Sequence, residues 1–101
     1  MKIIWSDLAK AQLYDVYEYY KDVASTKIAK SIKSKVCKKV RTLSRFPEMG
    51  QHELNPLVEP LNFRYLVSGN YKIIYQFFKE QKIILIASIF DTRQNPNDLK
   101  V

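Results

Sequence analysis

The segment 71-YKIIYQFFKEQKIILIASIF-90 contains two long apolar and aromatic runs separated by a short polar stretch. The first run, Tyr71 to Phe78, is rich in β-branched and aromatic residues and predicts a strand. The second, Ile83 to Phe90, is apolar at odd and even positions alike, with Ser88 its only polar residue. That pattern is typical of a central strand covered on both faces. The polar residues Lys79 to Lys82 predict a turn between the two strands.

The residues before this pair of strands predict a third strand and a loop. In residues 61–68 two sets of positions alternate. The set assigned to the core is Leu61, Phe63, Tyr65 and Val67, and the other set is Asn62, Arg64, Leu66 and Ser68. Arg64 belongs to the other set, so we expect it to point away from that core. Ser68-Gly69-Asn70 predicts the turn into the next strand. Glu48 to Pro60, which contains both glycine and proline, predicts an irregular surface loop.

The N-terminal half predicts one short strand and two helices. Lys2 to Trp5 is β-branched and aromatic, which favours a strand. Ser6 then resembles an N-cap, and apolar residues recur at helical spacing to about Val23. Ser25 or Thr26 caps a second helix that ends at Phe46-Pro47, with an apolar face made of Ile28, Ile32, Val36, Val40 and Leu43. The short break between the helices predicts an antiparallel hairpin.

These elements together predict a single α+β domain over residues 1–101. The helix hairpin must cover its apolar faces, and the strands provide the surface for it. We therefore expect an N-terminal strand, an αα-hairpin and a three-stranded antiparallel meander. The helices are expected on one face of a mostly antiparallel four-stranded sheet, and Arg64 on the other face.

The composition restricts partners and cofactors. The chain has 17 Lys and Arg against 10 Asp and Glu, a formal net charge of +7, so an anionic partner is favoured. Cys37 is the only cysteine, which excludes an intrachain disulfide and a cysteine-based zinc site, and favours a reducing cytoplasm. No cofactor or metal site is predicted. Polar residues follow Met1 within a few positions, before a long apolar run could develop, so we expect neither a signal peptide nor a membrane span.

The predicted second helix carries the strongest charge run of the chain. No acidic residue lies between Thr26 and Arg45, whereas the basic residues there are Lys27, Lys30, Lys33, Lys35, Lys38, Lys39, Arg41 and Arg45. Such a stripe can follow the phosphates of a nucleic acid. Because no aromatic residue is interleaved with it, the simpler interpretation is a solvated outer face of an amphipathic helix.

Three further cations lie near the strands. Arg64 and Lys72 fall on neighbouring predicted strands, and Arg93 follows the end of a third, so they are candidates for one anion-binding surface. The alternative is three unrelated surface charges. Asp91 is a candidate partner of either Arg93 or Arg64, and would then hold the C-terminal segment in place.

The order of elements, together with three short motifs, resembles the RelE/ParE toxin superfamily of type II toxin-antitoxin, or plasmid stabilisation, modules. The motifs are Phe63-Arg64-Tyr65, Tyr71-Lys72-Ile73-Ile74-Tyr75 and Asp91-Thr92-Arg93-Gln94-Asn95-Pro96. The resemblance implies contacts to a target or an antitoxin by Arg64, Lys72, Tyr71, Tyr75, Asp91, Arg93 and Gln94. Many ParE-like sequences have a histidine where this chain has Asp91, so a role of that histidine does not carry over.

Two activities occur in this superfamily: RelE-like members cleave messenger RNA in the ribosome, and ParE-like members poison DNA gyrase. A metal-independent nuclease needs groups that exchange protons. RelE-like nucleases often have a histidine or tyrosine near the last strand, whereas this chain has neither after Phe90. The candidates left for a nuclease are Arg64, Arg93, His52 and Glu53. The sequence therefore favours the ParE-like branch and a protein that is not an enzyme.

The expected function is a ParE-like toxin that forms a hetero-oligomer with a cognate antitoxin and is neutralised by it, with DNA gyrase as a possible target. Its basic surface would receive an acidic antitoxin segment. One alternative is a ribosome-dependent mRNA endoribonuclease. The other is an interaction module of the same fold without toxicity.

Overall fold

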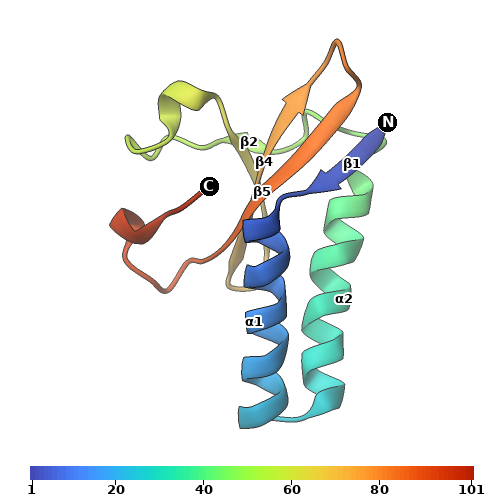
Figure 1. Cartoon of the computed structure of the whole chain (residues 1–101), viewed down its shortest axis with the longest axis vertical. Helices are drawn as coiled ribbons and strands as arrows, with labels where there is room; N and C mark the ends of the chain where they lie inside the picture. Colours follow the sequence, from blue (N-terminus) through green and yellow to red (C-terminus); the bar gives the residue numbers. More distant parts are fainter.

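The computed structural model describes residues 1–101 as a mixed five-stranded sheet with two helices on one face (Figure 1). The elements in chain order are β1 (Lys2–Trp5), α1 (Asp7–Val23), α2 (Thr26–Thr42), β2 (Gln51–His52), the 3-10 helix η1 (Glu59–Leu61), β3 (Arg64–Ser68), β4 (Tyr71–Phe78), β5 (Ile83–Asp91) and the 3-10 helix η2 (Pro96–Asp98). Neither α-helix is long and apolar enough to cross a membrane.

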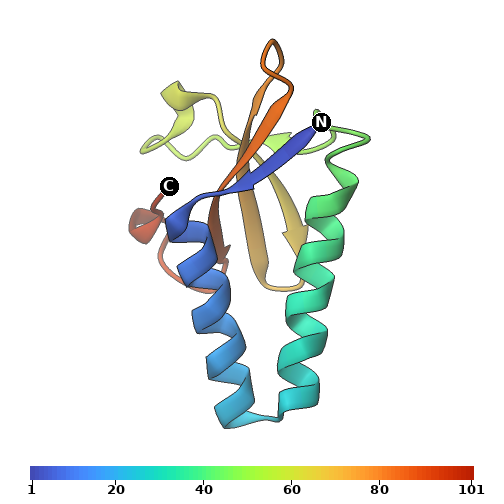
Figure 2. The same ribbon diagram turned by 45° about the vertical axis from the view of Figure 1, so that its right-hand side comes forward.

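The two helices begin at the serines that the sequence indicates. Ser6 Oγ accepts a hydrogen bond from the Ala9 N–H at 3.0 Å, and Ser25 Oγ accepts one from the Ile28 N–H at 3.1 Å. Ser25, not Thr26, is therefore the cap of α2. The helices run antiparallel, and the end of the hairpin extends beyond the sheet (Figure 2).

The strand order is β1-β5-β4-β3-β2. β3, β4 and β5 form the predicted antiparallel meander, and β1 pairs in parallel with β5. The prediction of four strands is wrong, because Gln51 and His52 pair with Tyr65 and Arg64 and add an edge strand. A strand of two residues shows no alternation that a sequence pattern can reveal.

β5 is the central strand and is covered on both faces, as predicted. The pairing of β4 with β5 shifts between Ile74 and Tyr75, which leaves Ala87 as an extra residue on β5. This bulge changes the alternation, so Ile86 and Ile89 both pack in the helix-facing core. Ala87 packs in a second core on the opposite face. The two cores thus explain why apolar residues occupy both odd and even positions, and the bulge explains why Ile86 and Ile89 share one face.

The second core is covered by chain outside the sheet. Val58, from the loop before η1, and Leu99, after η2, pack there against Phe63, Ile74, Ala87 and Phe90. Asn55 Nδ2 donates to the Pro96 carbonyl at 2.9 Å and ties the two covering segments together. The segment 48–60 is therefore more than a surface loop, because it contains β2, begins η1 and covers one face of the sheet.

Arg64 lies on the helix side of the sheet. The prediction from alternation, which placed it on the other face, is therefore wrong. Arg64 pairs with Tyr75 and lies two residues from Leu66, and both of these side chains belong to the helix-facing core. Phe63 instead packs in the opposite core. Both residue sets of β3 face apolar cores, so alternation alone could not tell which set meets the helices.

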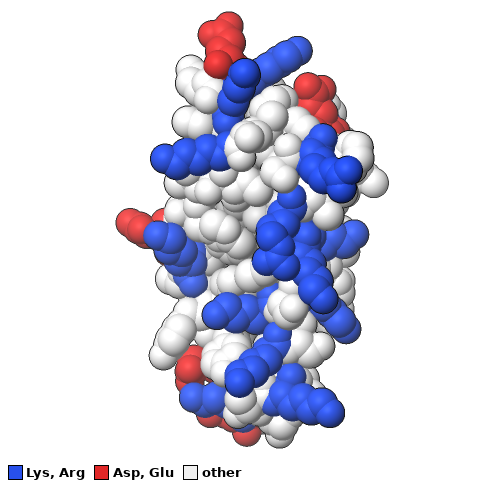
Figure 3. Space-filling model, turned by 90° about the vertical axis from the view of Figure 1, so that its right-hand side faces the viewer, with Lys and Arg blue, Asp and Glu red and all other residues white.

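The basic run follows the outer face of α2, and its side chains are all exposed (Figure 3). The residues opposite them, such as Val36 and Val40, are buried in the helix-facing core. The predicted amphipathic division of this helix is therefore confirmed from Ile32 onward, whereas Ile28, which the prediction placed on the apolar face, is 47% exposed.

Tyr75 joins the segment after α2 to the sheet. Its side chain is fully buried, its hydroxyl donates to the Pro47 carbonyl at 2.8 Å, and it accepts from the Gly50 N–H at 3.0 Å. A Cβ added at Gly50 would lie 2.6 Å from the Tyr75 hydroxyl, so only glycine fits against this ring. The contact fixes where the chain enters β2.

We expect Tyr75→Phe to lower the free energy of unfolding by about 2 kcal/mol, because the buried Gly50 N–H loses its only acceptor. Urea denaturation at neutral pH measures the change. Tyr14→Phe is the matched control, since Tyr14 is exposed and should change stability by less than about 0.5 kcal/mol. Equal stability of the two variants would contradict the proposed role of the Tyr75 hydroxyl.

Candidate functional site

The exit of β5 forms one wall of a groove against α1. Tyr71, Asp91, Arg93 and Gln94, all predicted as contact residues, line it together with Gln12 and Tyr19 of α1 and further residues. The groove has a volume of about 720 Å³. The C-terminal motif of the sequence therefore lies at one continuous surface with one side of α1, from Leu8 to Tyr19.

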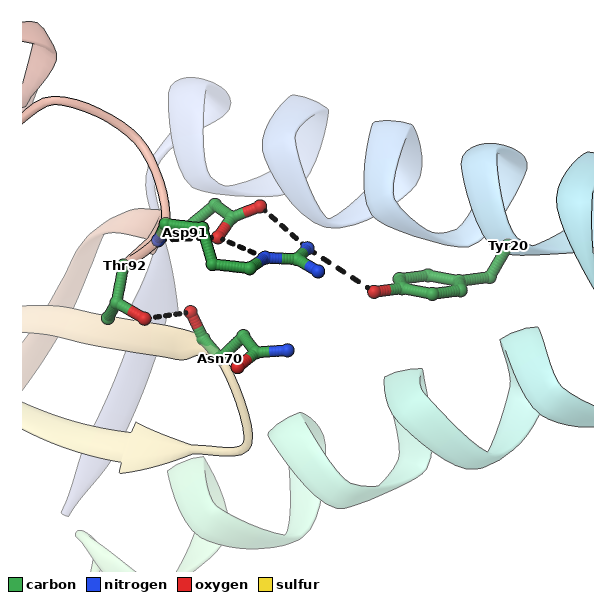
Figure 4. Close-up of polar contacts among 5 residues, drawn as sticks. Tyr20, Asn70, Asp91 and Thr92 are labelled. Atoms are coloured by element: carbon green, nitrogen blue, oxygen red, sulfur yellow. Dashed lines mark hydrogen bonds and ion pairs between the residues drawn. The ribbon is translucent and has the colours of Figure 1, made fainter.

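Arg93 is held in this groove by Asp91 (Figure 4). Its Nε donates to Asp91 Oδ1 at 3.0 Å and its Nη2 donates to Oδ2 at 2.8 Å. The Arg93 main-chain N–H also donates to Oδ1, at 2.9 Å. Asp91 thus pairs with Arg93 and not with Arg64. This bidentate pair fixes the plane of the guanidinium at the surface.

The exit is also tied to α1 and to the β3–β4 turn (Figure 4). Arg93 Nη2 donates to the Tyr20 hydroxyl at 3.4 Å, and the N–H and Oγ1 of Thr92 both donate to the Asn70 carbonyl, at 2.7 and 2.9 Å. Tyr20 therefore has a role beyond packing in the hairpin. The chain is held on both sides at the point where it leaves the sheet.

The charges in this groove are fixed at neutral pH. The Arg93 guanidinium lowers the pKa of the Asp91 carboxyl, and Asp91 in turn raises the pKa of Arg93. Burial raises the pKa of the Tyr71 hydroxyl, while hydrogen bonding to Tyr71 and then to Arg93 lowers that of Tyr20. Since Asp91 stays an anion and Arg93 a cation, the pair suits recognition better than proton transfer.

The predicted common surface of Arg64, Lys72 and Arg93 is not formed. Lys72 pairs with Val67, which is three residues from Arg64, and because this separation is odd Lys72 projects from the opposite face of the sheet. There its Nζ lies 2.9 Å from Glu53 Oε1 and 4.3 Å from the centre of the Tyr65 ring. These two cations cannot contact one small anion.

Arg64 and Tyr75 have structural partners on the helix side. Arg64 Nη1 donates to the main-chain carbonyls of Glu48 and Gly50, at 3.0 and 2.9 Å, and its Nη2 lies 3.9 Å from Glu48 Oε2. Tyr75 is fully buried. Both residues therefore shape the chain between α2 and β2 in this structure, which is a role the sequence does not indicate.

The four catalytic candidates fall into separate places. His52 stands directly across from Arg64 in the β2–β3 pairing, whereas Glu53 is bound to Lys72 on the other face. Arg64 pairs with Tyr75 and Asp91 with Tyr71. Four residues along β4 separate these positions, roughly 13 Å of strand. Arg64 and Arg93 are thus held at separate places by separate partners, Arg64 by the Glu48 and Gly50 carbonyls and Arg93 by Asp91.

A second groove, which the sequence did not reveal, lies between the two helices and β1. Its volume is about 670 Å³, and its apolar lining consists of Ile3, Trp5, Leu13, Tyr14, Tyr17, Cys37 and Val40. Lys10, Lys33 and Arg41 add three cations to it. Helical periodicity shows which faces are apolar but not which of them remain uncovered. The sequence offers one signal for this groove: the tyrosines of α1 occupy more than one face of the helix, and they are Tyr14, Tyr17, Tyr19 and Tyr20.

The ion pair between Asp91 and Arg93 should make the free energy of unfolding depend on pH in the acid range. Because folding lowers the pKa of Asp91, its contribution is fully present above the unfolded value of about 3.9 and is lost as the pH falls through the lower folded value. Asp91→Asn should therefore lower the free energy of unfolding at about pH 7, and the difference from the natural chain should shrink below about pH 4.

Urea denaturation across this pH range measures the difference. Asp15→Asn removes an exposed carboxylate of the same groove that forms no ion pair, and serves as the control for lost surface charge. A difference between Asp91→Asn and the natural chain that stays constant down to about pH 3 would contradict the pairing.

Comparison with known proteins agrees with this geometry. Residues 3–96 match the family model described as "ParE toxin of type II toxin-antitoxin system, parDE". Nine chains of solved structures match, among them one titled "Chromosomal ParDE TA system from P. aeruginosa", with a TM-score of 0.74 and 19% identity over 90% of this chain and 95% of that one. A search of curated proteins finds no match. Because the family model matches nearly the whole of this chain, the chain belongs to the ParE toxin family of type II toxin-antitoxin systems.

Proposed function

We propose that this ParE-family protein inhibits growth by acting on DNA gyrase in the cytoplasm, and that a cognate antitoxin neutralises it by binding the groove between α1, α2 and β1. The observation that carries the antitoxin contact is the combination of an apolar lining with three cations in that groove. The gyrase target is an inference from the family alone, since one fold serves different targets.

The groove has the properties that an amphipathic segment of opposite charge requires. Tyr14 is 63% exposed, and Ile3, Trp5 and Tyr17 are only partly buried, so apolar area is available to a partner. Lys33 Nζ lies 5.7 Å from the centre of the Tyr17 ring, which places a cation beside the apolar lining. An apolar side chain flanked by carboxylates would bury this area and pair these charges.

β1 offers a second way to hold the same segment. It pairs only with β5, so its other edge has unpaired backbone groups, and its Ile3 and Trp5 also line the groove. An extended part of the antitoxin can add to this edge while its apolar side chains enter the groove. The expected product is a toxin-antitoxin hetero-oligomer.

The exit groove is the proposed contact for the target. Arg93 is preorganised there by Asp91, and Gln94 follows it on the same surface. The guanidinium retains Nη1 without a protein acceptor and therefore has donors free for a carboxylate or carbonyl oxygen of a partner. Because α1 separates the two grooves, antitoxin and target contacts are assigned to different surfaces.

One observation favours the nuclease alternative. His52 lies directly across from Arg64, and the Glu48 carboxylate approaches the same guanidinium, so a proton-exchanging group and a cation meet at one sheet edge. Primer extension on translated message tests this alternative. If toxin-dependent cleavage is seen and is lost in His52→Gln, the gyrase proposal is replaced by ribonuclease activity. If no cleavage is seen, the alternative is removed.

Tyr14→Glu tests the antitoxin groove. This exposed change should leave growth inhibition intact but raise the Kd for the antitoxin encoded in the adjacent reading frame at least about tenfold, because it places an anion where an acidic segment binds. Titration calorimetry measures the Kd. Phe46→Glu, also exposed but outside the groove, is the matched control. Equal affinity of the two variants would place the antitoxin elsewhere.

Arg93→Gln tests the target contact. We expect the natural protein to inhibit supercoiling by purified DNA gyrase, and Arg93→Gln to need at least about tenfold more protein for the same effect, since a charged hydrogen bond is lost. Lys79→Gln, in the β4–β5 turn, controls for the change in net charge. Absence of inhibition by the natural protein would remove gyrase as the target.

A further inference from the structure

The outer face of α2 holds more cations than the two, Lys33 and Arg41, that also line the apolar groove. All the basic side chains from Lys27 to Arg45 are exposed, and none of them forms an ion pair. The nearest acidic residues along the chain are Asp22 and Glu48. Figure 3 shows these basic side chains spread along the face, with acidic ones at its margins.

This arrangement opposes the stability of the free helix. Like charges are placed at helical contact spacing, as in Lys35 and Lys39 or Lys38 and Arg41, where they repel each other. The first turn of α2 contains Lys27 and no acidic residue, although the helix dipole favours an anion there. A polyanionic partner would relieve both of these costs. A face that served only for solubility would not need one sign of charge throughout.

The cations gather on two flanks of α2. Lys30, Lys33 and Arg41 line a hollow of about 280 Å³ on the side of α1. On the side of the β3–β4 turn, Lys35, Lys38 and Lys39 line another of about 420 Å³. Because an α-helix turns about 100° per residue, Ser31 and Ser34 lie on the crest between these flanks, and Lys27 and Lys38 stand at the two ends of the crest. Lys38 therefore borders both the crest and the second flank. The small side chains of Ser31 and Ser34 make the centre of the crest low.

We propose that the outer face of α2 binds double-stranded DNA by lying along its major groove, with one triad of cations on each phosphate wall. An α-helix with its side chains is about 10–12 Å across, and the major groove is about 12 Å wide. Lys30 and Arg41 are about 16 Å apart along the helix axis, enough to follow several phosphates. The serine crest allows the helix to approach the groove floor.

The chemistry of the face distinguishes this partner from others. α2 has no aromatic residue, so it provides no platform for stacking the bases of a single strand. Its one exposed apolar residue, Ile28, lies in the first turn of the helix. Among the cations from Lys30 to Arg41 there is no exposed apolar side chain that an acidic protein segment could use as an anchor, whereas the antitoxin groove has several. Duplex RNA has a major groove too narrow for a helix. This DNA contact does not depend on the proposed gyrase target.

The test measures binding of the full chain to a fluorescein-labelled mixed-sequence DNA duplex of about 20 base pairs by anisotropy over a range of NaCl concentrations. We expect the plot of log K against log salt to have a slope of about −5, because six cations contribute about −0.9 each. The same duplex made of RNA should bind at least about tenfold more weakly at equal salt.

A triple variant and a matched control locate the surface. Lys35→Gln, Lys38→Gln and Lys39→Gln together should reduce the slope by about 2 to 3 and lower the affinity at least about tenfold. Their thermal midpoint should stay equal or rise, since repulsion is removed. Lys2→Gln, Lys79→Gln and Lys82→Gln remove the same charge at β1 and the β4–β5 turn and should leave the slope unchanged.

Four results would overturn the proposal: equal loss in the two triple variants, binding without salt dependence, equal binding of duplex RNA, or competition by polyglutamate as effective as unlabelled duplex DNA. The last result would assign the face to an acidic protein. Failure of the gyrase or antitoxin experiments leaves this measurement unaffected, because it uses neither partner.

Discussion

The clamp between α1 and the bulge of β5 sets the geometry on which both grooves depend. Ser6 Oγ donates to the Ala87 carbonyl at 2.9 Å, and Gln12 Oε1 accepts from the Ile89 N–H at 2.7 Å and from Ser88 Oγ at 3.1 Å. The bulge frees backbone groups in the buried centre of the sheet, and these side chains satisfy them. One helix is thereby fixed on the central strand. Because α1 lines both the exit groove and the apolar groove, the clamp positions both surfaces.

Much of the fold follows from local pattern. The serine caps, the helix hairpin and the two-sided burial of β5 are all visible in spacing and residue type, and each is confirmed. The errors concern β2, which is too short to show a period, and Arg64, whose strand has apolar residues on both faces. Which face of a doubly covered strand meets the helices depends on tertiary packing, and alternation does not record it.

The site was predictable where residues are close in sequence. Asp91, Arg93 and Gln94 come from one exit segment and share one groove, whereas Arg64 and Lys72, on different strands, project from opposite faces. The apolar groove was not predicted because its residues come from three elements, β1, α1 and α2. Which apolar side chains of these elements stay uncovered depends on how the elements pack together. The fixed Asp91–Arg93 pair suits recognition, as the proposed function requires. Under the proposed function, α1 separates the surface assigned to the antitoxin from the surface assigned to the target.

Backbone amide hydrogen exchange of the chain, free and bound to its antitoxin, tests this division most directly. The account predicts that the antitoxin increases protection in β1 and along α1 and α2 beside the apolar groove. The exit segment from Asp91 to Asn95 should exchange equally in both states. New protection confined to the exit segment, or to the loop that contains η1, would contradict the assignment of the two surfaces to opposite sides of α1.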